Sequence, residues 1–383
     1  MTQYHSNTPA LGRTVKLGLA LLLGLTLAAC GGPGASTVPR TGTLEEKHAY
    51  MVSHIDDLLA QQQDASQPGL SIVIVKDGAV AYSRSKGMAD IARNTPISEQ
   101  TVFELASLTK PITAIAVMQL EQRKLLSLND TIGKWLPQLP QTWGAITVHQ
   151  LLSHQTGIPD YMGGISPLAA LQLDGLTNDD LFKRFALDSH LNFAPGTSAG
   201  YSNSNYVILA EIIARASGRS YAQYVQENIF TPLGMRSSYV TGASALQPGD
   251  AALNYARSTT THGASFVTVG PIGVHSSAAD MTLLLRSLGT GQLVSLDTLA
   301  VMTSPKSGFP VLGSGEYYGY GWFMQRNSSP LTLFAHRGGA DGFRNIMRVN
   351  YTKGIYYVIL SNGGDATEKT LDAVLQVVQP LYE

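Results

Sequence analysis

Ser107 and Lys110 are the two side chains of this sequence that are best spaced for covalent chemistry, because they stand three positions apart. Residues with this spacing on an α-helix share one face. Lys110 can then take the proton of the Ser107 hydroxyl while that oxygen attacks a carbonyl carbon. Ser83 and Lys86 have the same spacing, but they fall in a predicted strand, where positions three apart point to opposite faces. The first pair is therefore the candidate nucleophile and base.

The residues around Ser107 predict that it stands at the beginning of an apolar helix. Ile112 and Ile115 repeat at helical spacing, and Pro111 suits a first turn, where its missing N–H has no intrahelical partner. Burial of the Lys110 amine in such a helix would lower its pKa from about 10.4 toward the range of a useful base. The alternative is a helix-capping serine beside a lysine that extends to solvent.

Two further motifs occur once each in the chain, Tyr201-Ser202-Asn203 and His336-Arg337-Gly338. Together with the motif that begins at Ser107, and in this order, they resemble the active-site motifs of the serine β-lactamase and penicillin-binding-protein superfamily. The resemblance is to the branch that holds class C β-lactamases, D-alanyl-D-alanine carboxypeptidases and family VIII esterases. It runs from about residue 46 to the end of the chain and includes the stretches Pro68–Ser71, Thr147–Gly157 and Ser276–Met281.

The resemblance implies a role for each residue of the first two motifs. Ser107 would form an acyl-enzyme, with Lys110 and Tyr201 sharing the proton transfers. The sequence leaves open which of these two is the principal base. A tyrosine with a reference pKa near 10 serves as a base only if nearby positive charge stabilises its phenolate. Asn203 would hold Lys110 and a substrate amide.

The third motif is implied to lie along the substrate. The backbone N–H groups of Gly339 and of the nucleophile would form the oxyanion hole, and Gly338 would let substrate lie against the strand. His336 replaces the lysine that opens this motif in class C β-lactamases. A fixed cation for a substrate carboxylate is then missing unless Arg337 or Arg344 supplies it. This difference favours a carboxypeptidase or an esterase over a true β-lactamase.

The predicted function is that of a serine hydrolase acting through an acyl-enzyme on a small acyl ester, a D-amino-acid peptide or a β-lactam-like substrate. The alternative is a penicillin-recognising sensor or another envelope binding protein that does not turn over. No cofactor is expected. His149, His154 and His190 are expected to be structural, because no His-Glu-x-x-His motif or paired cysteines accompany them.

Composition and the N-terminal pattern predict a secreted, globular protein. The chain is 44% hydrophobic, and its 26 basic and 27 acidic residues argue against a nucleic-acid partner. Arg13 and Lys16 precede an apolar run over 17–29, which has the layout of a signal peptide and is short for a membrane span. The run ends at Cys30, the single cysteine, in a tetrapeptide that resembles a bacterial lipobox.

These features predict a lipid-anchored protein of the bacterial cell envelope. Residues 1–29 would be removed as a lipoprotein signal peptide, and Cys30 would carry the lipid. Residues 30–45, rich in Gly, Pro, Ser and Thr, would form a flexible tether. Gly31 after the cysteine favours the outer membrane, with the enzyme facing the periplasm. An ordinary secretory signal or an uncleaved anchor is the alternative, and the oligomeric state stays open.

The periodicities predict an α+β fold of the β-lactamase/transpeptidase type. An amphipathic helix over 50–61 precedes strands over 70–75 and 79–83, joined by an Asp-Gly hairpin turn. Helical patterns follow at 181–187, 206–216 and 221–229, and strand patterns at 317–324, 331–336, 343–350 and 356–361, with a last helix over 366–381.

We expect these elements to form one antiparallel sheet flanked by the N- and C-terminal helices, with a large, mainly helical lobe inserted and the active site between the lobes. The expected boundaries place the sheet lobe at 46–106 and 261–383 and the helical lobe at 107–260.

Overall fold

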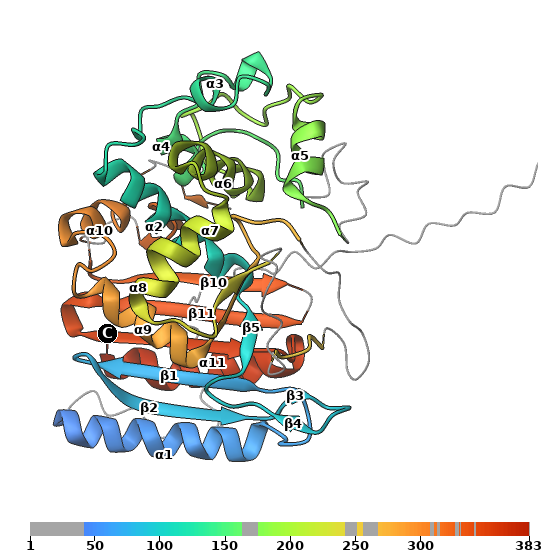
Figure 1. Cartoon of the computed structure of the whole chain (residues 1–383). Helices are drawn as coiled ribbons and strands as arrows, with labels where there is room; N and C mark the ends of the chain where they lie inside the picture. The colour runs from blue at the N-terminus through green and yellow to red at the C-terminus, as the bar shows by residue number, and fades with distance from the viewer. Residues whose placement is uncertain are drawn as a thin grey trace, which may run out of the picture.

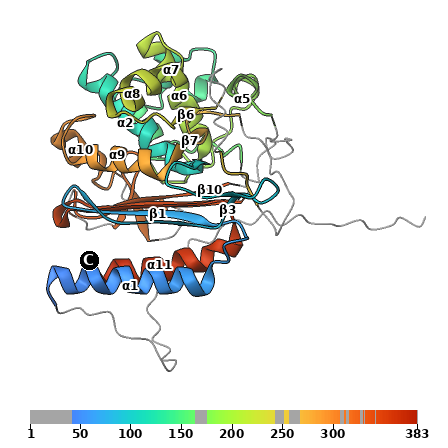
Figure 2. The ribbon, with the colours of Figure 1, turned by 60° about the horizontal axis from the view of Figure 1, so that its bottom comes forward.

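The computed structural model describes residues 42–162, 175–241, 251–255, 267–306, 310–311, 315–325, 329, 331–340 and 342–382. Within them, a seven-stranded antiparallel sheet has the strand order β2-β1-β12-β11-β10-β9-β8. Helices α1 (Leu44–Gln62) and α11 (Asp365–Tyr382) lie side by side on one face of this sheet, and the other labelled helices lie on the opposite face (Figure 1, Figure 2). The predicted α+β architecture, with both end helices flanking an antiparallel sheet, is confirmed.

The first hairpin forms where the Asp-Gly turn predicts it. Strands β1 (Leu70–Lys76) and β2 (Ala79–Lys86) are joined through Asp77 and Gly78, both with positive φ, as the favoured two-residue hairpin turn requires. Because Ser83 and Lys86 both lie in β2, they do not share a face. The other edge of β1 pairs with β12 (Ile355–Ser361), so the strands that come first and last along the chain are neighbours in the sheet.

The later strands differ in part from the predicted ones. β11 (Phe343–Asn350) has the expected bounds, but the expected strand over 317–324 is a hairpin of β8 (Glu316–Tyr318) and β9 (Phe323–Gln325). The chain turns at Gly321, whose φ of 83° is unfavourable for a residue with a Cβ. The expected strand over 331–336 is also displaced: Leu331 has a φ of 66°, and β10 runs from Phe334 to Ala340. The third motif therefore lies inside β10 and not at its end.

Helix α1 begins six residues before the predicted start and within the segment predicted to be a tether. Thr43 caps it, because its side chain accepts from the Glu46 N–H while the Glu46 side chain accepts from the Thr43 N–H. This capping box satisfies two donors that a helix start otherwise leaves free. The face that buries Met51, Ile55 and Leu59 packs in the core between the sheet and α11, as its spacing predicts.

Helix α2 (Thr109–Gln122) is the centre of the opposite layer, with nearly every side chain buried. A 3₁₀ turn, Ala106–Leu108, leads into it from strand β5 (Val102–Glu104). Helix α6 (Asn203–Ser217) packs against α2 and ends at Gly218, whose left-handed conformation is the expected stop.

The remaining elements are short. A second sheet has the order β5-β7-β6, and β3 pairs with β4. The remaining bounds are β3 (Met88–Asp90), β4 (Thr95–Pro96), β6 (Tyr239–Val240), β7 (Val274–Ser277), α3 (Ile132–Trp135), α4 (Val148–Leu152), α5 (Asn178–Phe185), α7 (Tyr221–Val225), α8 (Thr231–Leu233), α9 (Ala278–Leu288), α10 (Leu296–Met302), and 3₁₀ turns at Gln141–Trp143 and Tyr351–Lys353.

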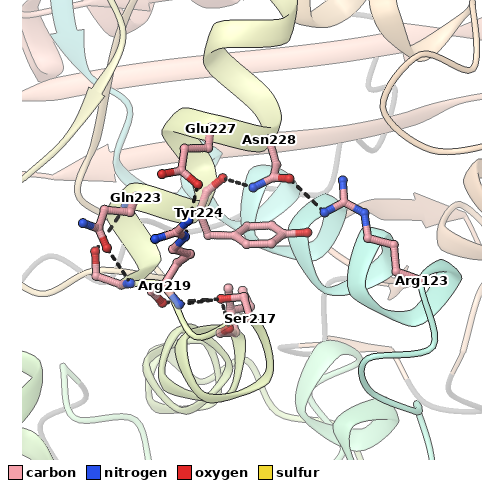
Figure 3. Close-up of polar contacts among 9 residues, drawn as sticks. Arg123, Ser217, Arg219, Gln223, Tyr224, Glu227 and Asn228 are labelled. Carbon is pink, nitrogen blue, oxygen red and sulfur yellow. Dashed lines mark hydrogen bonds and ion pairs between the residues drawn. The ribbon is translucent and has the colours of Figure 1, made fainter.

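A surface cluster joins the end of α2 to the turn that follows α7 (Figure 3). That turn, Gln226–Phe230, is π-helical. Arg123 Nη1 donates to Asn228 Oδ1 at 2.8 Å, and Asn228 Nδ2 donates to the Tyr224 carbonyl at 3.0 Å. The nearby Arg219–Glu227 ion pair is exposed on both sides, so it contributes little, about 0–1 kcal/mol. Of these contacts, the Arg123–Asn228 hydrogen bond is the one that joins α2 to this turn.

Several predictions lie outside the described residues. These are the signal peptide over 1–29, the lipidation at Cys30 and most of the tether, and the boundary at 260/261 falls in the gap over 256–266. In the part of the chain that is described, no helix combines the length and the apolar character that crossing a membrane requires.

Candidate active site

Ser107 lies in the 3₁₀ turn between β5 and α2, with its side chain part-buried. The residue before it, Ala106, is fully buried and has a φ of 50°, a conformation that costs a residue with a Cβ about 1–2 kcal/mol. Backbone strain of this kind is found where the surrounding structure holds a functional group in one direction. The turn therefore presents Ser107 in a fixed position at the start of α2.

The Lys110 amine is fully buried and has three oxygen neighbours. Its Nζ donates to Asn203 Oδ1 at 2.7 Å and to the Pro271 carbonyl at 3.1 Å, and it lies 3.0 Å from Ser107 Oγ. The first two oxygens only accept hydrogen bonds. A neutral amine has two hydrogens and one lone pair, so its hydrogens go to Asn203 and Pro271, and the lone pair is left facing Ser107. The predicted pair is thus in contact, with the geometry of a base and a nucleophile.

Burial also sets the charge of this amine. Removal from water disfavours the ammonium form and lowers the pKa of Lys110 to about 7, although the Asp160 carboxylate opposes this effect. A large fraction of Lys110 is therefore neutral near neutral pH.

Tyr201 stands over this amine, with Lys110 Nζ 4.7 Å from the centre of its ring. Burial raises the pKa of the Tyr201 hydroxyl well above its usual value, and this effect outweighs a hydrogen bond with Ser107 that lowers it. The phenol therefore keeps its proton at neutral pH. Of the two bases that the sequence leaves open, Lys110 is the one that loses its proton.

Asn203 begins α6 and links Lys110 to a carboxylate that the sequence analysis did not single out. Asn203 Nδ2 donates to Asp160 Oδ2 at 3.0 Å, and the Asn203 backbone N–H donates to Asp160 Oδ1 at 3.1 Å. Asp160 and the Pro271 carbonyl were both missed, because an aspartate and a proline in separate loops form no motif. Proximity of Asp160 to the matched stretch Thr147–Gly157 was the one available signal.

His336 is buried in β10 and uncharged. Burial, with the positive charge of Lys110 as a second cause, lowers the pKa of His336 to about 3. Its Nδ1 lies 2.7 Å from the Arg337 carbonyl, which only accepts, so Nδ1 carries the hydrogen. Its Nε2 then accepts from the Tyr318 hydroxyl at 2.8 Å. The residue at the position of the family's lysine is therefore a neutral ring with both nitrogens engaged.

Neither of the two arginines near the third motif takes the place of the lysine that His336 replaces. Arg337 is exposed and, by strand alternation, points to the side of β10 opposite to His336. Arg344 pairs in register with Gly339 and binds Asp365 Oδ1, at the start of α11, at 2.9 Å. The fixed positive charge therefore lies away from the neutral third-motif side chain.

Gly338 is required by the turn Ala106–Leu108, which carries Ser107 and is called the nucleophile turn below. A Cβ at this position would lie 2.3 Å from the Leu105 carbonyl oxygen and 3.2 Å from the Leu108 nitrogen. The glycine therefore allows β10 to approach the turn that carries Ser107, which is a different reason from the predicted approach of substrate. A Cβ at Gly339 would meet nothing closer than Arg344 Nη1 at 3.8 Å. Gly339, the second predicted oxyanion donor, is thus held next to the nucleophile turn by its neighbour.

His154 supports the loop that carries Tyr201. Its fully buried ring packs on Tyr201 and Tyr318, with ring centres 4.5 and 4.7 Å away. Its Nδ1 accepts from the Ser202 N–H at 3.3 Å and from Asn205 Nδ2 at 3.1 Å. Burial keeps its pKa well below the usual value, so the ring is neutral.

The other two histidines lie apart from this loop. His149 contacts the Tyr320 hydroxyl through Nδ1 at 2.6 Å, and His190 is exposed. Within the ranges described above, no group of His, Cys, Asp and Glu is arranged to hold a metal ion.

Comparison with known proteins agrees with this geometry. A family model described as Beta-lactamase matches residues 55–379. The chain is 28% identical over 333 residues to penicillin-binding protein 4* of Bacillus subtilis, covering 82% of this chain and 72% of that protein. It is 32% identical over 183 residues to esterase EstB of Burkholderia gladioli, covering 44% and 46%.

A solved structure shows the same architecture. The octameric penicillin-binding protein homologue from Pyrococcus abyssi superposes with a TM-score of 0.72 at 26% identity, covering 88% of this chain and 78% of that one. Because the family model spans all three motifs and nearly the whole described body, this chain belongs to the Beta-lactamase family, whose members include penicillin-binding proteins and esterases that act as serine hydrolases.

Proposed function

We propose that this protein hydrolyses an uncharged ester or amide through an acyl-enzyme formed on Ser107. The observation that carries the choice of substrate is the neutral His336. Its pKa of about 3 leaves no positive charge at the position where class C β-lactamases have lysine. A substrate that depends on a carboxylate at this place, as a β-lactam does, loses that ion pair. A small acyl ester needs no such partner.

The contacts at Ser107 support a sequence of proton transfers. The lone pair of neutral Lys110 takes the Ser107 proton as Oγ bonds to the substrate carbonyl carbon. The backbone N–H groups of Ser107 and Gly339 receive the negative charge that develops on the carbonyl oxygen. Tyr201, which keeps its proton, passes it to the leaving alcohol or amine and is reprotonated by the Lys110 ammonium. Water then attacks the acyl-enzyme and releases the acid.

The side chains around the site also favour an apolar acyl group. Tyr201 and Phe323 stack with ring centres 6.0 Å apart, and Tyr318 packs edge-on against Phe323 at 4.7 Å. These rings come from the Tyr201 loop and from the β8–β9 hairpin, and Tyr201 is the one that hydrogen-bonds with Ser107. EstB, one of the relatives, is named as an esterase. We therefore rank a short-chain ester above a D-amino-acid peptide, and a D-amino-acid peptide above a β-lactam.

The protein and its Ser107→Ala variant should be mixed separately with p-nitrophenyl butyrate, benzylpenicillin and an acyl-D-alanyl-D-alanine peptide. Intact mass reports the adduct, and absorbance or chromatography reports released product. We expect ester turnover by the wild type and a loss of at least about 10⁴-fold in Ser107→Ala.

Each other outcome has a definite meaning. A stable penicillin adduct without product release would instead identify a sensor. Equal activity in both proteins would remove Ser107 from the reaction.

We further propose that the protein is attached to the bacterial outer membrane by a lipid on Cys30 and faces the periplasm. The apolar run over 17–29 and the lipobox-like ending at the single cysteine support this proposal.

A further inference from the structure

Asp160 is a carboxylate behind the active site that has no place in the three motifs. It accepts three N–H groups: Oδ1 accepts from the backbones of Met162 and Asn203, both at 3.1 Å, and Oδ2 accepts from Asn203 Nδ2 at 3.0 Å. Two of the three donors belong to Asn203. The Asp160 carboxylate therefore binds both the backbone and the side chain of Asn203, the residue that contacts Lys110.

These hydrogen bonds decide which end of the Asn203 amide faces Lys110. An ionised carboxylate only accepts hydrogen bonds, so the Nδ2 end must turn toward Asp160, and the Oδ1 end must turn toward Lys110 Nζ, 2.7 Å away. In the reversed amide, two oxygens would face each other on one side and two donors on the other. Without Asp160, the amide loses the acceptor that holds its Nδ2 end away from the lysine.

The amide orientation in turn decides where the Lys110 lone pair points. Asn203 Oδ1 and the Pro271 carbonyl take the two hydrogens of the neutral amine, which leaves the lone pair for Ser107 Oγ. If Asn203 presented Nδ2, the amide would compete with the serine proton for that lone pair. We propose that Asp160 is a positioning residue that acts through Asn203 to direct the Lys110 lone pair at the nucleophile.

The charge of Asp160 supports the same assignment. His154 and His336 are neutral, and Tyr201 and Tyr206 keep their protons, because burial shifts all four pKa values that way. The charged group that acts on the amine is Asp160, which raises the pKa of Lys110 against the larger effect of burial. Burial raises the pKa of Asp160 itself, while its three N–H donors and Lys110 favour its ionised form.

The inference rests on the proposed function, so its test uses a reaction that needs only the attack of Ser107 Oγ and no hydrolysis step. A fluorophosphonate reacts as Ser107 Oγ bonds to phosphorus, fluoride leaves and Lys110 takes the proton. Its rate should be followed by intact mass from pH 5 to pH 10, in parallel with p-nitrophenyl butyrate hydrolysis. In Asp160→Asn we expect the plateau rate to fall by about 10²-fold with KM little changed. The midpoint of the pH profile should move to lower pH, because the carboxylate no longer favours the Lys110 ammonium.

Two further variants separate positioning from a general effect on the loop. Asp188 makes the same two-residue turn, since its Oδ1 accepts from the His190 N–H at 2.9 Å, and Asp188→Asn should behave as the wild type. Asp160→Glu keeps the charge, so its midpoint should stay near that of the wild type. The midpoint does not depend on how much of a variant folds, so it remains a valid readout if Asp160→Asn is unstable.

A double-mutant cycle tests the path through Asn203. In the Asn203→Ala background, adding Asp160→Asn should change the plateau rate by less than about twofold, because the amide that Asp160 orients is already gone. Independent, multiplying effects would overturn the proposal, as would an unshifted midpoint in Asp160→Asn. Failure of the wild type itself to react at Ser107 would instead overturn the proposed function.

Discussion

At the scale of single residues, burial lowers the pKa of Lys110 to about 7, far below the usual value of a lysine. The spacing from Ser107 was sufficient to predict that the two side chains meet, because it depends only on a local helix. The protonation states of Lys110 and Tyr201 were not predictable, since they depend on burial. The rings that enclose Tyr201 and keep its phenol protonated come from His154 and Tyr318, far away in the sequence. Asp160 escaped prediction for the same reason, as its meaning comes from a contact with Asn203.

The first prediction at this scale concerns the pH dependence of catalysis. Lys110 must be neutral to accept the Ser107 proton, and its pKa is lowered to about 7. The value of kcat/KM for p-nitrophenyl butyrate should therefore rise as pH increases through about 7 and level off above it. Measurement from pH 5.5 to 9 checks this, after correction for spontaneous ester hydrolysis. A rate that does not change between pH 6 and pH 9 would remove Lys110 as the titrating base.

The same burial predicts that Lys110 reduces stability. Its pKa is about 7 in the folded state and about 10.5 in the unfolded chain, so between these values only the unfolded state binds the proton. The free energy of unfolding of the wild type should then rise with pH from 7 to 10.5. Lys110→Met removes this term, so its melting temperature should exceed that of the wild type at pH 6, with a difference that shrinks toward pH 9.

Thermal denaturation at pH 6 and pH 9 measures this difference. As a control, Lys183→Met changes a side chain that is 76% exposed and should alter the free energy of unfolding by less than about 0.5 kcal/mol. A Lys110→Met variant less stable than the wild type at pH 6 would show that the contacts of the lysine outweigh its desolvation.

At the scale of elements, the sequence predicted structure that depends on neighbouring residues, and it did not predict structure that depends on distant contacts. The hairpin of β1 and β2 was predictable because Asp77 and Gly78 form its turn without help from the rest of the chain. The break between β8 and β9 was not, because Gly321 turns where a Cβ would lie 2.8 Å from Ala114 Cβ and 3.0 Å from Pro111 Cα. That contact with α2 exists only in the folded protein.

The prediction at this scale concerns the contact between β10 and the nucleophile turn. In Gly338→Ala, the new methyl group meets the Leu105 carbonyl oxygen at 2.3 Å, so the strand and the turn must separate. We expect the free energy of unfolding to fall by about 1–3 kcal/mol and the reaction of Ser107 with a fluorophosphonate to slow. Denaturant unfolding and fluorophosphonate labelling measure these two effects.

The adjacent glycine provides the comparison for stability. At Gly339 the new methyl group has no neighbour closer than 3.8 Å, so Gly339→Ala should lower the stability much less. Equal losses in the two variants would show that the close approach at Gly338 is not what requires a glycine.

At the scale of the whole molecule, the two-layer arrangement on either side of one antiparallel sheet followed from combining strands near both ends of the chain with helices between them. Its exact strand order did not follow from the pattern, because any of the late strands could have met β1. The pairing of Leu70 with Ser361 depends on packing between the sheet and the end helices. Ile72 and Ile359 lie in one core with side chains of α1 and α11.

The pairing of β1 with β12 also has a consequence for the order of events during folding. The chain places 278 residues between Lys76 and Ile355, two residues that are cross-strand partners. Contacts between such distant segments form slowly, because a very long loop must close first. Until the last strand has been synthesised, the hairpin of β1 and β2 therefore has one edge whose backbone N–H and C=O groups are unpaired. During that interval the unpaired edge of β1 is open to pairing with another chain, which is a route to misassembly.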